Sequence, residues 1–184
     1  MQYIDAAGLT GLFKVPDMEV DHALITALVE QWRSETHTFH LPHGEMGITL
    51  QDIEVMLGIP VDGLLVTGRT DYKSNLLCRE LLGHEPPPVI PNSNTSTLIG
   101  ARIKYKWLDA QFAAPLAVDA SDEVVQQHGC YHLLVQMGAL LFMDKSANRV
   151  SLVPLQLLNP ISNARRYSWG SAALAWLYRQ LCGA

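Results

Sequence analysis

Histidine is the residue type that first invites a search for chemistry, because the chain carries seven of them. Three recur at every third position, as His37, His40 and His43. They fall on a predicted strand that ends at Pro42, and strand side chains alternate between two faces, so these imidazoles do not converge unaided. We interpret them as a polar strand edge and predict no metal site there.

A second pair, His128 and His132, lies four residues apart on a predicted helix, a spacing that can place both rings on one face. The zinc-protease motif has this spacing with a glutamate beside the first histidine. Here the intervening residues are glycine, cysteine and tyrosine, so no general base is present and two further structural ligands are missing nearby. The favoured interpretation is that His128 packs in the core with one hydrogen bond.

Other catalytic signatures are missing from the sequence. It contains no G-x-S-x-G elbow, no Walker A or G-x-G-x-x-G loop, and no lysine in a context that resembles a cofactor Schiff base. Cys130 is near both histidines but inside a mainly apolar helix, where a thiol behaves as a small hydrophobe. We therefore predict no catalytic residue, no cofactor and no metal.

Basic residues give the only positive signal for a contact site. Arg102, Lys104 and Lys106 alternate with apolar and aromatic residues, so an extended segment would show a basic face for a phosphate or an acidic partner, whereas a helix would scatter the charges. The competing interpretation is a solvated face. Arg165 and Arg166 precede a predicted helix N-terminus, where the helix dipole disfavours cations, so we expect them to pair with acids in the fold or on a partner.

The composition is that of a globular chain, whose fold must position the residues described above. Thirteen lysines and arginines against 18 acids give a net charge of −5, and 48% of the 184 residues are hydrophobic. Charged residues make up only 17% of the chain, against about 25% in an average globular domain. The sequence therefore predicts one ordered domain, over 1–184, whose surface is partly covered by a partner.

Cysteine usage and hydropathy indicate the compartment. Cys78, Cys130 and Cys182 are odd in number and widely spaced, which suits free thiols in a reducing compartment. The N-terminus does not resemble a signal peptide, and the most apolar segment, 133–143, is well short of the ~20 residues that cross a bilayer. We expect a soluble chain with no membrane partner.

Periodicity predicts a mainly helical α+β fold, a single compact domain with a few short strands near the N-terminal third. Strands are expected at 36–41 and 46–49, with further short extended pieces at 64–67 and 150–153. One clear loop, proline-rich and variable, covers 84–97, and a turn covers 143–149. Helices are expected at 20–35 with Asp17 or Asp21 as N-cap, from the Thr49–Asp52 capping signal to Gly58, and at 74–82, 103–112, 119–143 and from Ser168 onward.

Several segments resemble one family, in its order. They are E-T-H-T-F-H-L-P at 35–42, G-E-M at 44–46, I-T-L-Q-D-I-E-V-M-L-G-I-P-V-D-G at 48–63, and further stretches at 6–12, 27–33, 125–128, 141–152 and 167–182. On these residues the chain is similar to the plant mobile domain, also labelled aminotransferase-like, of the maintenance-of-meristems-like proteins. Two positions depart from the family pattern, His43 in place of a cysteine and His132 in place of an aromatic residue.

The resemblance implies a non-enzymatic nuclear module of protein–protein interaction that acts in transposable-element silencing, control of gene expression and genome integrity in plants. Its implied partners are a relative of the plant serine/threonine protein phosphatases and DNA or chromatin. Family domains usually continue with further apolar helices, so 1–184 could be the N-terminal portion of a longer domain. In that case the apolar stripe of Leu174, Leu177 and Leu181 would seek a partner such as another copy of the chain.

Two alternatives stay open. The same domain could bind DNA directly and with sequence dependence through Arg102, Lys104 and Lys106. An unrecognised hydrolase or transferase would instead require a deep polar cleft lined by at least two of His128, His132 and Asp144.

Overall fold

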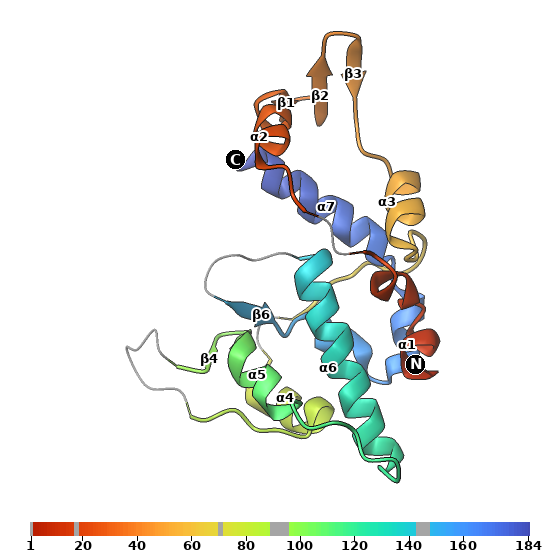
Figure 1. Cartoon of the computed structure of the whole chain (residues 1–184), viewed down its shortest axis with the longest axis vertical. Helices are drawn as coiled ribbons and strands as arrows, with labels where there is room; N and C mark the ends of the chain where they lie inside the picture. The colour runs from red at the N-terminus through yellow and green to blue at the C-terminus, as the bar shows by residue number, and fades with distance from the viewer. Residues whose placement is uncertain (1, 17–18, 70–71, 89–95, 143–147) are drawn as a thin grey trace.

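Helices dominate the computed structural model, which describes residues 2–16, 19–69, 72–88, 96–142 and 148–184 (Figure 1). The α-helices are α1 (Gln2–Ala7), α2 (His22–Glu30), α3 (Leu50–Leu57), α4 (Ser74–Leu82), α5 (Tyr105–Gln111), α6 (Asp122–Leu140) and α7 (Trp169–Cys182), with 3-10 helices η1 (Thr10–Phe13), η2 (Pro154–Leu158) and η3 (Ile161–Arg166). The strands are β1 (Trp32–Arg33), β2 (Thr38–Leu41), β3 (Gly44–Met46), β4 (Leu98–Ile99), β5 (Arg102–Lys104) and β6 (Arg149–Ser151).

Short side chains cap the starts of α2 and α3, as the sequence predicts. Thr49 and Asp52 form a reciprocal capping box on α3, in which the Asp52 carboxylate accepts from the Thr49 backbone N–H at 2.8 Å. Gly58 then ends α3 in the left-handed conformation, at φ 59°. The Asp21 carboxylate caps α2 by accepting from two backbone N–H groups, each at 3.0 Å. The other N-cap candidate, Asp17, lies outside the described residues.

Two small antiparallel sheets form, in the orders β1-β2-β3 and β4-β5-β6. The first lies in the N-terminal third, as expected. The second joins residues far apart in the sequence, with Ile103 opposite both Leu98 and Val150. The prediction of a helix from residue 103 is wrong for its first two residues, because Ile103 is fully buried between these two apolar partners and α5 begins only at Tyr105. The extended piece predicted at 64–67 is reduced to one parallel bridge, between Leu64 and Tyr167.

One hydrophobic core joins the second sheet to the helices around α6, which crosses the centre of Figure 1. Leu133, Leu134 and Met137 give α6 a fully buried face, and α4 and η2 pack against this helix. Trp169, at the start of α7, is completely buried and donates its indole N–H to the Ala164 carbonyl at 2.8 Å. The fold is therefore α+β and mainly helical, built on a single core.

The first predicted helix differs most from expectation. It ends at Glu30, and Trp32 belongs to β1 rather than to the apolar stripe of the helix. The stripe itself is not covered: α2 has no buried residue, and Leu24 is 56% exposed. Periodicity correctly indicates an amphipathic helix, but it does not say whether another element packs on the apolar face.

An aromatic cluster, formed by Trp32, His37, Phe39 and Tyr178, fastens the first sheet to the C-terminal half of α7. His37 stacks on Tyr178 at 5.4 Å with an interplanar angle of 4°, and the Trp32 ring lies 5.3 Å from Tyr178. The Trp32 indole N–H also donates to the Cys182 sulfur at 3.5 Å. The sheet and the end of α7 lie together at the top of Figure 1.

The N-terminal segment closes on α3 through two glycines. A Cβ atom on Gly11 would overlap the backbone carbonyls of Leu57 and Gly58, and a Cβ on Gly58 would lie 3.2 Å from the Gly11 Cα. Because backbone atoms cannot rotate away, only glycine allows η1 to approach the end of α3 this closely.

Candidate functional site

The three histidines of the first sheet have separate environments. His37 stacks on Tyr178, as described above. His40 Nε2 lies 3.3 Å from Glu45 Oε1, an ion-pair distance without hydrogen-bond geometry, and His43 is exposed in the turn between β2 and β3. Across the described part of the chain, no group of three or more histidine, cysteine and acidic side chains is arranged to hold a metal ion.

His128 and His132 do come together, on the wall of a cleft of about 650 Å³ between α1, α6 and residues 112–116. The His128 Nδ1 atom is 3.0 Å from the Val124 carbonyl oxygen, which agrees with the single hydrogen bond predicted. The ring is only half-buried, however, because it borders the cleft rather than the core. It lies nearly perpendicular to the Phe112 ring, with the ring centroids 5.0 Å apart. Desolvation lowers the pKa of His132, and the His128 imidazole lowers it further.

This cleft meets the residue condition of the hydrolase or transferase alternative, because His128 and His132 both line it, but its lining is mostly apolar rather than polar. Gln2, Tyr3 and the two histidines are its polar lining residues, and the rest of the lining described is apolar. Cys130 lies on α6 in the buried core, where desolvation raises the thiol pKa to about 12, so it is not a thiolate at neutral pH. Asp144, the third residue of the hydrolase alternative, lies outside the described residues.

The predicted basic stripe divides at the junction of strand and helix. Arg102 and Lys104 share one face of β5, and Lys106 is exposed on α5. Arg165 and Arg166 are exposed at the end of η3, and neither forms an ion pair with an acid among the residues described. The expected pairing within the fold is therefore not seen there.

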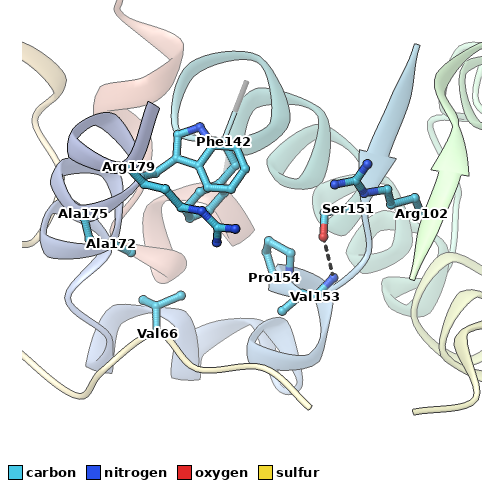
Figure 2. Close-up of a pocket in the computed structure, with 10 residues that line it drawn as sticks. Val66, Arg102, Phe142, Ser151, Val153, Pro154, Ala172, Ala175 and Arg179 are labelled. Carbon is cyan, nitrogen blue, oxygen red and sulfur yellow. Dashed lines mark hydrogen bonds between the residues drawn. The ribbon is translucent and has the colours of Figure 1, made fainter. Parts of the chain in front are cut away.

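A second cleft, of about 470 Å³, brings Arg102 together with a cation that the sequence analysis did not select, Arg179. Figure 2 shows Arg179 reaching from α7 into the opening near Phe142, with Arg102 on the opposite wall. Trp176 also lines the cleft. The spacing of Ala172, Ala175, Trp176 and Arg179 would have indicated this face of α7, because residues three, four and seven apart align on a helix. The stripe of Leu174, Leu177 and Leu181, which the sequence singled out instead, is half-buried.

Among the described residues, no helix is both long enough and apolar enough to cross a bilayer.

No solved structure matches the chain. Similar curated proteins are all from Arabidopsis thaliana. A serine/threonine-protein phosphatase 7 long form homolog is 45% identical over 96% of this chain and 13% of its own length. Protein MAIN-LIKE 2 is 37% identical over 98% of the chain and 26% of its own length, and protein MAINTENANCE OF MERISTEMS is 36% identical over 97% and 36%.

The chain thus spans at most about a third of these relatives, yet they align with almost all of it. The family model of the plant mobile domain matches residues 8–184, which include α7 and both clefts apart from the first residues of α1. This match agrees with the resemblance carried by the motifs at 35–63 and 167–182. The chain belongs to the plant mobile domain family.

Proposed function

We propose that this chain is a non-enzymatic module of protein–protein interaction in the plant nucleus, acting in transposable-element silencing, control of gene expression and genome integrity. One relative is named for a phosphatase, which supports a phosphatase relative as one partner. Chromatin is the second partner that we propose. Nuclear localisation is part of the proposal, and a fluorescent fusion confined to the cytoplasm of plant cells would contradict it.

The observation that carries the proposal is the apolar surface left by neighbouring residues of α3. Val55 is 85% exposed and Met56 is 70% exposed, although Ile53 on the same helix is buried. Solvent-exposed aliphatic groups side by side are unfavourable in water and are a common property of interaction surfaces. Within the described residues, no group of three or more histidine, cysteine and acidic side chains is placed to hold a metal ion.

The test is recovery of partners from plant nuclear extract on a tagged chain. A phosphatase relative and chromatin components should be recovered, and the Val55→Ser/Met56→Ser double variant should recover less of them. Glu54→Gln, an exposed change on the same helix, serves as the matched control. Recovery of neither class of partner would refute the proposal. Turnover of a small molecule by the purified chain, abolished by one substitution that leaves it folded, would refute the non-enzymatic part.

Direct DNA binding is the second candidate, favoured by the position of three cations on one sheet. The register places Lys104 opposite Arg149, next to Arg102. A binding site for phosphates would release counterions, so affinity should fall steeply as salt rises. Replacing Arg102, Lys104 and Lys106 by alanine should flatten that dependence. An unchanged salt slope would leave these residues as a solvated face.

A further inference from the structure

We infer that the cleft between α7 and β6–η2, lined by Arg102 and Arg179, binds an acidic peptide segment of a partner, with a bulky apolar side chain beside its carboxylates. The inference deepens the proposed interaction function and rests on it, because it assigns a place and a chemistry to one contact.

The shape of the cleft follows from side-chain size along α7. Ala172 and Ala175 stand one turn apart on the face that borders the cleft, and their methyl groups leave room beside the larger Trp176. Phe142, just after α6, packs nearly perpendicular to Trp176 with ring centroids 6.0 Å apart, so two aromatic rings form one apolar wall. Figure 2 shows Ala172 and Ala175 on one side of the opening and Pro154 on the other.

Among the residues described, the charged side chains that line the cleft are all cationic. Arg102 and Arg179 both line it, and no aspartate or glutamate does so among the residues described, although the whole chain has a net charge of −5. The Arg179 side chain also has no hydrogen bond or ion pair to any described residue, and its guanidinium points into the opening. A guanidinium can hold a carboxylate with two parallel N–H···O bonds, which selects an acidic ligand.

The remainder of the lining favours a peptide over a nucleic acid. Val66, Val153 and Pro154 face the opening together with the aromatic wall, so apolar contact makes up most of the surface. Nucleic-acid grooves instead line the phosphate track with several cations, and the described lining of this cleft has two. A segment with one large apolar residue against Trp176 and an acid reaching Arg179 would satisfy both parts of the lining.

A random twelve-residue phage-display library, selected on the purified chain, tests the inference. Enriched peptides should combine acidic residues with a bulky apolar residue. The Arg179→Gln variant should weaken the binding of the best of them about tenfold to a hundredfold, because a charge-assisted hydrogen bond is lost. Ala175→Trp, which fills the space while keeping both arginines, should also abolish binding. Arg165→Gln removes an exposed cation outside the cleft and is the matched control, expected to bind as the unaltered chain does.

Each other result would overturn the inference: no enriched peptide, peptides without acids, affinity unaffected by Arg179→Gln, or displacement by single-stranded DNA and not by acidic peptide. A dimer in solution that Ala175→Trp dissociates would assign the face to a second copy instead. The Arg179→Gln and Ala175→Trp variants in the nuclear pull-down distinguish failure of the cleft assignment from failure of the proposed interaction function. If partners are recovered equally by both variants, only the cleft assignment fails, whereas recovery of no partner by the unaltered chain refutes the interaction function itself.

Discussion

Replacing Gly11 by alanine should be among the most costly single-methyl changes in this fold. The added Cβ would overlap the carbonyls of Leu57 and Gly58, where the end of α3 meets η1, and neither is a side chain that can rotate away. Overpacking of this kind costs typically 1–3 kcal/mol. Because backbone must shift here, we expect about 3 kcal/mol of lost unfolding free energy, the upper end of that range.

Urea denaturation followed by circular dichroism measures the loss. With a denaturant dependence of about 2 kcal/mol/M, a loss of about 3 kcal/mol lowers the midpoint by about 1.5 M. Gly47→Ala is the matched control, because a Cβ there meets only ordinary contacts at 3.7 Å and 3.8 Å. It should change stability by less than about 1 kcal/mol, with stabilisation favoured. A Gly11→Ala midpoint within about 0.3 M of the unaltered chain would refute the backbone clash.

Three further predictions concern titratable groups. Hydrogen bonds from the Thr49 backbone and hydroxyl lower the pKa of Asp52 below 3.8, so the stabilisation from its carboxylate is present above that pH and is lost as pH falls through the lower folded value. Asp52→Asn should accordingly reduce the difference between urea midpoints at pH 6 and pH 3, and an unchanged difference would contradict this. Of the three free thiols, only Cys182 is exposed, and the buried two have a pKa of about 12, so an aromatic disulfide reagent at pH 8 should modify one thiol in the native chain and three in urea. NMR titration should give His132 a pKa below its ordinary value of 6.5. His128→Gln should raise that pKa only partly, since desolvation lowers it more than His128 does. A full return to 6.5 would show instead that His128 is the larger cause.

Local signals allowed both ends of α3 to be predicted. The capping box at Thr49 and the left-handed glycine at Gly58 fix the two ends of α3 through contacts within a few residues, so a sequence pattern contains the necessary information. Ser168 shows the limit of this reasoning. It precedes α7 as predicted, but its hydroxyl contacts Val61, far away in the sequence, and Ser171 rather than a backbone N–H of the helix.

Features that depend on distant partners were not predictable from the pattern. Ile103 pairs with Val150 across 47 residues, and this pairing determines that residues 102–104 form a strand. The presence of Arg102 and Arg179 in one cleft likewise depends on how α7 lies against β6. The sequence around each arginine gives no signal for that arrangement. The same limit explains α2, whose apolar stripe is visible in the sequence while its exposure is not.

The link between the first sheet and α7 has a consequence for the order of folding during synthesis. The Trp32 indole is hydrogen-bonded to the Cys182 sulfur across 150 residues of sequence, and His37 stacks on the Tyr178 ring. A three-stranded sheet this short is marginal without such packing. As the ribosome releases the chain from its N-terminus, the three strands of this sheet therefore emerge early. The sheet becomes stable only after nearly all of α7 has been synthesised. During that interval, its aromatic side chains are open to chaperones.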